Sequence, residues 1–293
     1  MKKVLFIVNP CAGKMKILKD LLEIDRAFYN GGCDCDVYLT NKKGDAIKKV
    51  KDCGKNYDII VVGGGDGTYN ELITGVLEAG IDLPIGYIPA GTTNDFASTL
   101  ALSQNPVTAA MNIATGKPTP LDVGKFGDMY FSYIASFGAF TSTSYSTQQQ
   151  MKNVFGHSAY LLEGMTDLAS IKPYHARIEA NGKVYEDDYL FGAVCNSTSI
   201  AGLIKLDEKL VNLSDGEFEI LLIRMPKLLV DLPKIFLALK SGDYKEKHIQ
   251  FLHAPTVKVI TDGKLNWALD GECAESIGEV TLKNIHSAVR LLV

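Results

Sequence analysis

The first 120 residues of the chain alternate short apolar runs with stretches of helical periodicity. The apolar runs predict strands at Val4–Val8, Val37–Thr40, Ile59–Val62 and Ile85–Ile88. The periodic stretches predict helices at Lys14–Tyr29, Asp45–Cys53, Thr68–Ala79 and Pro106–Thr115. Asn105 is placed to cap the last of these helices, with Pro106 at its first position. Strands that alternate with helices predict an α/β domain around a parallel sheet, where ligands bind beyond the carboxyl ends of the strands.

After Pro120 the pattern changes to one strand after another. The dipeptides Gly127-Asp128 and Asn181-Gly182 predict hairpin turns. Further strands are predicted at Glu217–Arg224, Thr256–Ile260, Val280–Ile285 and Ala288–Val293. Two helices are predicted, one around Ser158–Ala169 and one at Lys227–Lys240. We therefore expect two domains: residues 1–120, which are α/β, and residues 121–286, which are mostly antiparallel and β-sandwich-like. The final strand, at about 287–293, is a candidate for return to the first domain.

Composition narrows the class of protein. Of the 293 residues, 46% are hydrophobic and 22% charged, as in globular proteins with a sizeable core. The net charge of −4 argues against a general nucleic-acid binder, so we expect no nucleic-acid partner. The six cysteines contain no CxxC pair, which favours a reduced, cytoplasmic protein. The apolar run Val4–Val8 is too short for a signal peptide, and no stretch reaches the ~18 apolar residues of a transmembrane segment.

One glycine-rich turn, "GGGDGT" at Gly63–Thr68, follows a predicted strand and opens a predicted helix. Backbone N–H groups at such a helix N-terminus form an anion site. The turn lacks both the last glycine of a Rossmann fingerprint and the GK[ST] of a Walker A loop. A bare phosphate would be repelled by Asp66, whereas a phosphate that carries Mg²⁺ would not. The turn therefore predicts a magnesium nucleotide beside Asp66; the alternative is that Asp66 only caps a helix.

A second turn, "PAGTTNDFA", follows the fourth predicted strand. Gly91 permits close approach of a ligand, while Thr92 and Asn94 offer short hydrogen-bonding groups. Because both turns follow strands of one sheet, we expect them to face one another. A third short stretch, "LDGE", places Glu272 directly after Asp270-Gly271, and by itself it predicts a plain hairpin turn.

Together these stretches resemble a known family. "GGGDGTYNE", "PAGTTNDFA" and "LDGE" occur in this order, after "NPCAGK" near the start and with "VNLSDGEFEILLI" before the last of them. The combination is similar to soluble bacterial diacylglycerol kinases and sphingosine-kinase-like lipid kinases, whereas GGDGT alone is shared with NAD kinases and phosphofructokinases. The resemblance implies a nucleotide domain of the NAD-kinase/phosphofructokinase type, a β-sandwich-like domain, and an active site between the two.

The resemblance also implies roles for individual residues. The expected ATP contacts are Thr40, Gly65, Asp66, Gly67, Thr68, Tyr69, Asn70, Glu71 and Thr92. The turns themselves add Gly64, Gly91 and Asn94, and Lys14 is a candidate for neutralising phosphate charge. By resemblance, Glu272 is the general base for a lipid hydroxyl, and Asp66 and Asp95 organise Mg²⁺ at the phosphates. A structural Mg²⁺ is implied at Asp215, with backbone oxygens near Asn212 and Glu217.

The expected activity is that of an ATP- and Mg²⁺-dependent kinase for diacylglycerol or a related lipid alcohol, bound peripherally to the membrane. A NAD kinase and a nucleotide-binding module without catalysis are the alternatives. The segment Lys227–Lys240 is apolar enough to touch acyl chains, although a helix packed on the core is the favoured interpretation. Around Asn196 the chain carries Ser197, Thr198 and Ser199 where many family members carry glycines, so the sequence does not identify the lipid acceptor. The sequence also leaves open whether the protein forms a homodimer.

Overall fold

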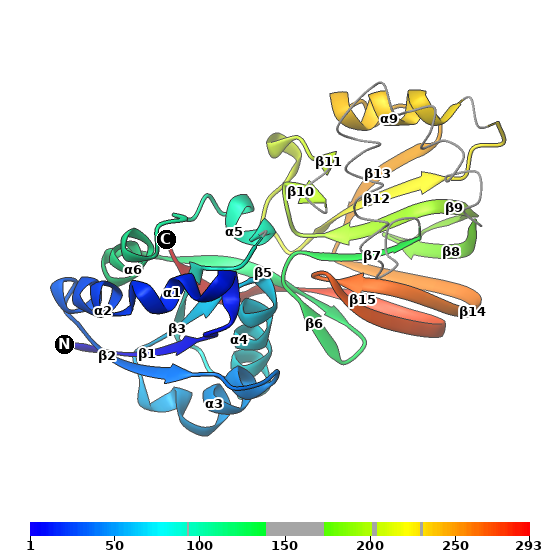
Figure 1. Cartoon of the computed structure of the whole chain (residues 1–293). Helices are drawn as coiled ribbons and strands as arrows, with labels where there is room; N and C mark the ends of the chain where they lie inside the picture. Colours follow the sequence, from blue (N-terminus) through cyan, green and yellow to red (C-terminus); the bar gives the residue numbers. More distant parts are fainter. Residues whose placement is uncertain (93, 139–172, 201–203, 229–230) are drawn as a thin grey trace. The chain divides into compact units, whose positions relative to one another are not determined.

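The chain forms two compact units in the structure, a computed structural model that describes residues 1–92, 94–138, 173–200, 204–228 and 231–293, without the side chains of residues 14–16. Unit 1 comprises Met1–Val123 and Ile285–Val293, and unit 2 comprises Gly124–Asn284 (Figure 1). Two strands, β5 (Pro118–Phe126) and β15 (Glu272–Leu292), belong partly to each unit. Each unit has its own apolar core and is described by itself.

Unit 1 alternates strands with helices. Its further strands are β1 (Lys2–Val8), β2 (Cys33–Leu39), β3 (Ile59–Gly64) and β4 (Pro84–Pro89). Its α-helices are α1 (Lys16–Lys19), α2 (Leu21–Asn30), α3 (Asp45–Cys53), α4 (Asp66–Glu78), α5 (Asp95–Thr99) and α6 (Pro106–Thr115), with 3₁₀ turns η1 (Ala12–Met15) and η2 (Gly54–Asn56). The predicted helix Asp45–Cys53 is α3, and the predicted helix at Pro106–Thr115 is α6. As predicted, the Asn105 side chain caps α6, because its Oδ1 accepts the Thr108 N–H at 2.9 Å.

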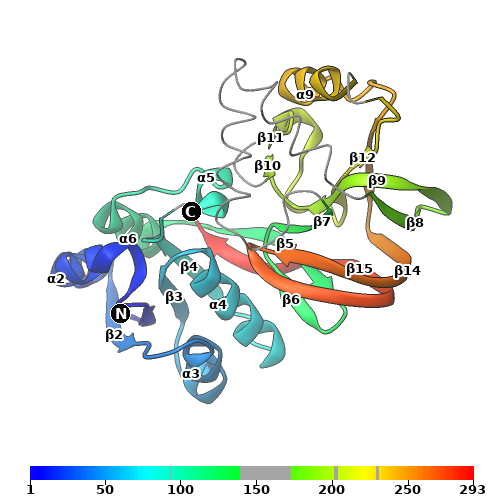
Figure 2. The same ribbon diagram turned by 45° about the vertical axis from the view of Figure 1, so that its right-hand side comes forward.

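The sheet of unit 1 runs in the order β2-β1-β3-β4-β15, and neighbouring strands pair in parallel. Helices α2 and α6 cover one face, and α3 and α4 cover the other (Figures 1 and 2). Phe28 of α2 and Ile113 of α6 share a core with Phe6 and Val61 of the sheet. Strands β1 and β3 are continuous apolar runs because both of their faces are buried. The carboxyl ends of β1, β3 and β4 therefore meet at one edge, where their loops gather.

The prediction of one helix over Lys14–Tyr29 is wrong, because η1, α1 and α2 divide this segment. Gly13 has a left-handed φ of +54°, and a Cβ on it would lie 2.1 Å from the Ala90 carbonyl oxygen. The chain is thus pressed against the end of β4 just before the expected helix start. A second irregularity follows at Asp20, after which α2 begins.

Unit 2 is mostly antiparallel. Its further elements are β6 (Met129–Phe131), β7 (Ile134–Gly138), β8 (Tyr174–Ala180), β9 (Lys183–Cys195), β10 (Ser199–Ile200), β11 (Ile204–Lys205), η3 (Glu208–Leu210), β12 (Phe218–Arg224), α9 (Leu232–Ser241), β13 (Ile249–Ala254) and β14 (Thr256–Leu269). The strand order is β13-β12-β9-β7-β14-β15, and β8 pairs with both β9 and β14. At the centre of the core, the Trp267 ring lies 5.0 Å from both Phe126 and Phe137, edge to face.

The predicted hairpins of unit 2 are confirmed. Gly127-Asp128 joins β5 to β6, with Phe126 paired to Met129. Asn181-Gly182 joins β8 to β9, and both residues have positive φ, as a type I′ turn requires. Asp270-Gly271 joins β14 to β15 in the same way, with φ of +49° and +87°.

The C-terminal strands differ from their prediction, because β15 is one strand where two were expected. Its polar stretch around Ser287, which suggests a turn, has a left-handed φ of +50° at that residue. The buried Asp122 carboxylate accepts the Ser287 N–H at 2.6 Å and lies 3.2 Å from His286 Nδ1, so this site is held within the strand. The Asp122 side chain, which is distant in the sequence, therefore supplies the hydrogen-bond acceptor for the backbone N–H of Ser287.

The helix predicted at Lys227–Lys240 is shorter than expected, since α9 begins at Leu232 with Pro233 in its first turn. The helix predicted around Ser158–Ala169 lies outside the described residues. In the described part of the chain, every helix is too short or too polar to cross a membrane.

Candidate functional site

The two glycine turns of unit 1 meet at the carboxyl edge of the sheet. The Ala90 N–H donates to the Gly64 carbonyl at 2.7 Å, which joins the ends of β3 and β4. A Cβ on Gly91 would lie 2.6 Å from the Gly65 α-carbon, so the two backbones pass too closely for a larger residue. The structure thus brings both turns together, as expected from their places after two strands of one sheet.

Asp66 belongs to the first glycine turn, and its carboxylate caps α5, the helix that follows the second turn. One of its oxygens accepts the Asp95 N–H, which opens α5, at 3.0 Å, and the other accepts the Tyr87 hydroxyl at 3.3 Å. Burial raises the pKa of Asp66, although hydrogen bonds from the N–H groups of Asp95 and Phe96 and from Tyr87 work in the opposite direction. A half-buried carboxylate of this kind gains from a nearby cation.

Tyr87 and Tyr69 form a buried aromatic base under this turn. Their rings stack with centroids 4.8 Å apart, and Tyr69 also packs on Phe96 at 5.4 Å. Burial raises the pKa of Tyr87, with Asp66 adding to the shift, so the hydroxyl stays protonated and donates. The Tyr69 ring is 1% exposed, so this side chain supports the turn from beneath.

Asn94 shapes the second turn with a strained backbone. Its φ is +49°, and its side-chain oxygen accepts the Gly91 N–H at 2.8 Å. Its amide group donates back to the Gly91 carbonyl at 3.2 Å. Thr92 is exposed next to this closed turn. These contacts assign Asn94 a clear role in holding the turn.

Glu71 has partners that the sequence did not suggest. Its carboxylate accepts the Gly44 N–H at 2.8 Å and the Ala46 N–H at 3.2 Å, and so satisfies the N-terminus of α3. Asn70, one residue earlier, accepts the Thr74 hydroxyl at 3.4 Å. Glu71 therefore joins α4 to the loop that follows β2.

The loops after β1 and β2 reach the same edge. The Thr40 N–H donates to the Val8 carbonyl at 2.9 Å, so Thr40 is held beside the end of β1. Asn9 Nδ2 donates to the hydroxyl of Thr68 in α4 at 3.3 Å. Lys14 lies in η1, directly after Gly13, which packs against the end of β4; the side chain of Lys14 is outside the description.

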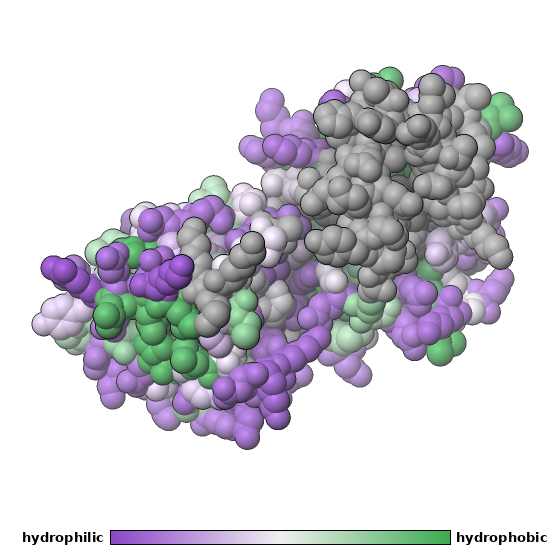
Figure 3. Space-filling view, in the orientation of Figure 1, coloured by the Kyte–Doolittle hydropathy of each residue, from purple (hydrophilic) through white to green (hydrophobic). Residues whose placement is uncertain are grey.

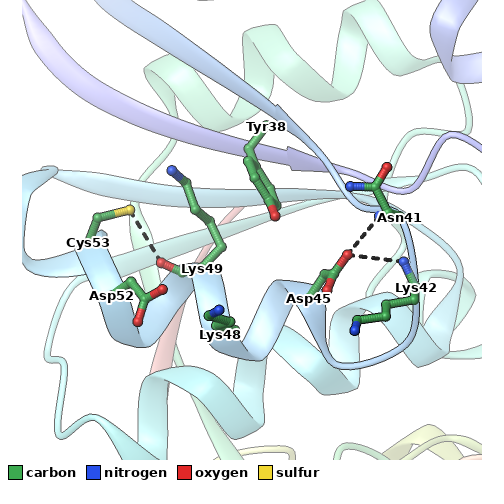
Figure 4. Close-up of a pocket in the computed structure, with 8 residues that line it drawn as sticks. All are labelled: Tyr38, Asn41, Lys42, Asp45, Lys48, Lys49, Asp52 and Cys53. Atoms are coloured by element: carbon green, nitrogen blue, oxygen red, sulfur yellow. Dashed lines mark hydrogen bonds between the residues drawn. The ribbon is translucent and has the colours of Figure 1, made fainter.

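A cavity of about 550 Å³ lies between the end of β2 and α3 (Figure 4). Its lining residues carry three lysines and two aspartates: Tyr38, Asn41, Lys42, Asp45, Lys48, Lys49, Asp52 and Cys53. Asp45 is engaged by the N–H groups of Asn41 and Lys42, and the Lys49 ammonium lies 4.8 Å from the Tyr38 ring centroid. None of the predicted site residues lines this cavity.

In unit 2, Glu272 is exposed at the first position of β15, directly after the β14–β15 turn. That turn is anchored by Asp270, which is 8% exposed. The Asp270 carboxylate accepts the N–H groups of Tyr133 at 3.0 Å and Ile134 at 3.1 Å, and that of Ser132 as well. This anchor was missed in the sequence, where Asp-Gly indicated only a turn. Because the Asp270 carboxylate holds this turn, the backbone of Glu272 is also held in place.

Replacing Asp270 with Ala is expected to lower the free energy of unfolding of the protein by about 1–3 kcal/mol, because three buried N–H groups lose their acceptor. Asp270→Asn keeps one acceptor oxygen and tolerates positive φ, so it should cost less. Urea denaturation measures both, with Asp128→Ala in the exposed β5–β6 turn as the control. Equal stability of Asp270→Ala and Asp128→Ala would contradict this role.

The loop before β12 contains Asn212, Asp215 and Glu217. Asn212 Oδ1 accepts the Ser214 N–H at 3.2 Å, and Asp215 Oδ1 accepts the Glu217 N–H at 3.0 Å. No group of three or more acidic, histidine or cysteine side chains positioned to hold a metal occurs in the described ranges. A cation here would therefore rely on backbone oxygens as well as on Asp215.

Glu219, which the sequence analysis missed, lies under this loop. It is 1% exposed; its Oε1 accepts the Asn212 N–H at 3.3 Å, and its Oε2 has no hydrogen-bond partner. Burial raises its pKa to about 8. The only signal in the sequence was a carboxylate in the otherwise apolar strand "FEILLI".

Comparison with known proteins identifies both parts of the chain. Residues 3–126 match the diacylglycerol kinase catalytic domain family, and residues 135–293 match the YegS C-terminal NAD kinase beta sandwich-like domain family. The diacylglycerol kinase of Bacillus subtilis (strain 168) is 31% identical over 274 residues, which are 93% of this chain and 90% of that protein. The diacylglycerol kinase of Staphylococcus saprophyticus is 32% identical over 277 residues, 92% and 89% of the two chains.

Solved structures share the fold. A crystal structure of a diacylglycerol kinase from Bacillus anthracis strain Sterne has a TM-score of 0.77 at 24% identity and covers 99% of this chain and 96% of that one. Another crystal structure from the same bacterium has a TM-score of 0.80 at 25% identity, with coverages of 99% and 97%.

The two-domain architecture and these relatives define an ATP-dependent lipid kinase, and they do not favour a NAD kinase. The chain belongs to the diacylglycerol kinase family.

Proposed function

We propose that the protein transfers the terminal phosphoryl group of ATP, with Mg²⁺, to the hydroxyl group of diacylglycerol or a related membrane lipid. The observation that carries this proposal is the convergence of two glycine turns on the half-buried Asp66, in a chain of the diacylglycerol kinase family. Phosphoryl transfer depends mainly on positioning and on neutralisation of charge, which such a backbone site can supply.

The nucleotide domain of this proposal comprises residues 1–120 and the strand at about 287–293, with an NAD-kinase/phosphofructokinase-like fold. The N-terminus of α4 and the turn at Gly91 would hold the phosphates, with Thr40, Thr92 and Lys14 around them. The Asp66 side chain fits a role beside a phosphate-bound cation, since a carboxylate has about four acceptor sites and the N–H groups of Asp95 and Phe96 and the Tyr87 hydroxyl do not fill them all. Asp95, at the start of α5, would act with it.

The acceptor domain of this proposal comprises residues 121–286. Glu272 would take the proton of the lipid hydroxyl as that oxygen attacks the terminal phosphorus of ATP, with ADP as the leaving group. The exposed position of Glu272 on an anchored turn supports this assignment. We infer that the enzyme meets its acceptor at the membrane surface.

We also propose a structural Mg²⁺ at Asp215 with backbone oxygens of Asn212 and Glu217. The orphaned Oε2 atom of the buried Glu219 under this loop supports a cation nearby. Mg²⁺ at roughly tenfold its Kd should raise the free energy of unfolding by about 1.4 kcal/mol. Thermal unfolding with and without Mg²⁺ tests this: Asp215→Asn should lose the stabilisation, and Asp262→Asn, at an exposed site, should keep it. Equal stabilisation of both variants by Mg²⁺ would show that the ion does not bind at Asp215.

A transfer assay with labelled ATP tests the main proposal. Diacylglycerol, NAD and an extract of total membrane lipid serve as rival acceptors, with and without Mg²⁺. Label in a lipid product, dependent on Mg²⁺, is the expected result. Label in NAD phosphate would favour a NAD kinase, and nucleotide binding without transfer to any acceptor would favour a regulatory module.

A further inference from the structure

Three side chains of unit 1 form a hydrogen-bonded chain that the kinase proposal does not use. The Asp122 carboxylate, in a residue that is 1% exposed, lies 3.2 Å from Nδ1 of the His286 ring. On the other side of the ring, Nε2 lies 3.3 Å from the Ser287 hydroxyl. A carboxylate, an imidazole and a hydroxyl in this order are the parts of an activated serine nucleophile.

The buried carboxylate determines which nitrogen of the His286 ring carries the proton. Because an ionised carboxylate only accepts hydrogen bonds, Nδ1 of the neutral ring must donate to Asp122. Nε2 is then left as an acceptor, and it faces the Ser287 hydroxyl. The His286 side chain is 59% exposed, yet both of its nitrogens are engaged. The ring is therefore held in the orientation that a general base needs.

The contact between the neighbouring residues His286 and Ser287 requires an unusual backbone. In a regular strand consecutive side chains point to opposite faces, so a histidine and the serine after it would not meet. Ser287 has a left-handed φ of +50°, which breaks this alternation within β15. The Asp122 carboxylate accepts the Ser287 N–H at 2.6 Å and so holds this conformation. That one hydrogen bond is enough to hold the backbone, and it does not account for a ring placed between the carboxylate and the hydroxyl.

The surroundings of Ser287 favour a small substrate. Both His286 and Ser287 are exposed, so a molecule in solution can reach the hydroxyl. Leu121 and Val123, on either side of Asp122, and Val289 are at most 5% exposed, so they are not available to an acyl chain. In Figure 3, apolar side chains gather over β2, which is the strand at the opposite edge of the unit 1 sheet from β15. A short acyl group, which needs no apolar surface, therefore fits this position best.

We propose that unit 1 carries a second catalytic centre that hydrolyses small acyl esters, with Ser287 and His286 as catalytic residues and Asp122 as the positioning residue. The Ser287 oxygen attacks the carbonyl carbon of the ester while its proton passes to His286 Nε2. The carbon–oxygen bond to the alcohol then breaks, and His286 returns the proton to the departing oxygen. Water attacks the acyl-serine with His286 again as the base, which releases the carboxylic acid and restores the serine. This activity goes beyond the proposed kinase, since none of the three residues is assigned to phosphoryl transfer.

Labelling of the full chain with a fluorophosphonate, which reacts with activated serines by loss of fluoride, tests the proposal directly. Mass spectrometry should find the phosphonyl group on Ser287 and not on Ser241, an exposed serine whose hydroxyl donates to a backbone carbonyl. His286→Gln should lower the labelling rate by about 10²-fold or more, the contribution of a positioned general base. Asp122→Asn keeps an acceptor for the Ser287 N–H but loses the charge that stabilises a protonated ring, so it should lower the rate by about tenfold or more.

The matched control is His175→Gln in unit 2. His175 also pairs with an aspartate, since its Nδ1 lies 2.9 Å from Asp188. Its Nε2 lies 3.8 Å from Glu186, and among the described residues no hydroxyl hydrogen-bonds to it. This variant should be labelled at Ser287 as fast as the wild type. A Ser287 that stays unlabelled, or that is labelled equally fast in His286→Gln and the wild type, would overturn the inference.

Turnover of p-nitrophenyl acetate measures the release of the acyl group as well as the attack. The wild type should release p-nitrophenol in excess over the enzyme, and Ser287→Ala should lower the steady-state rate by about tenfold or more. Ser287→Gly should lose the same activity, and it suits the positive φ, so it guards against a loss of fold. Labelling of Ser287 without turnover would contradict the hydrolysis. Both variants should keep the kinase activity of the wild type, and a wild type without kinase activity would bear on the proposed function alone.

Discussion

Replacing Glu272 with Gln is expected to lower kcat for phosphorylation of the lipid by about 10²–10⁴, with little change in the affinity for ATP. The amide keeps the size of the side chain but cannot accept the proton of the acceptor hydroxyl. The backbone at this position should not move, because Asp270 holds the turn through the N–H groups of Tyr133 and Ile134. Steady-state kinetics with both substrates, together with binding of an ATP analogue, measures the two effects separately.

The matched control is Glu275→Gln, which removes another exposed carboxylate from the same strand. This variant should lose only an exposed ion pair with Lys264 and keep its turnover number. A Glu272→Gln enzyme with unaltered kcat would exclude this residue as the general base. Equal losses in both variants would point to the charge of the strand as a whole.

Replacing Asp66 with Asn is expected to lower kcat/KM for MgATP by about 10²–10³, the range found when one preorganised charged or polar group is removed from such a site. The variant loses the negative charge that we assign to organising Mg²⁺. It also keeps only one oxygen to serve both the Asp95 N–H and the Tyr87 hydroxyl. Activity should therefore fall at every Mg²⁺ concentration, and most at low Mg²⁺.

Tyr87→Phe separates the charge of Asp66 from its hydrogen bonding. This change removes the hydroxyl at 3.3 Å and leaves the carboxylate in place. It should cost about 1 kcal/mol of unfolding free energy and less than tenfold in kcat/KM. If Asp66→Asn were fully active at low Mg²⁺, Asp66 would be a helix cap and nothing more.

Local patterns were enough to predict much of the secondary structure. The buried strands β1 and β3 are continuous apolar runs, and the three turns with Asp-Gly, Gly-Asp or Asn-Gly carry their own conformational preference. The facing glycine turns followed from their places after two strands of one sheet. In each case the cause lies within a few residues of the structure it produces.

The missed features depend on partners that are distant along the chain. Asp270 accepts N–H groups more than 130 residues away, and Glu71 caps a helix that begins 26 residues before it. Asp122 stabilises the positive φ of Ser287 across 165 residues. A carboxylate in the sequence does not reveal which backbone donors the fold brings to it, so these residues were identified only in three dimensions.

The way β15 completes unit 1 has a consequence for biosynthesis. Leu291 and Leu292 are buried, and Arg290 and Leu291 pair with β4, which was made about 200 residues earlier. During translation the sheet of unit 1 therefore keeps one edge open until β15 has been synthesised. A nascent chain that lacks β15 would expose this edge, so synthesis of β15, rather than of the first half, should time the folding of unit 1.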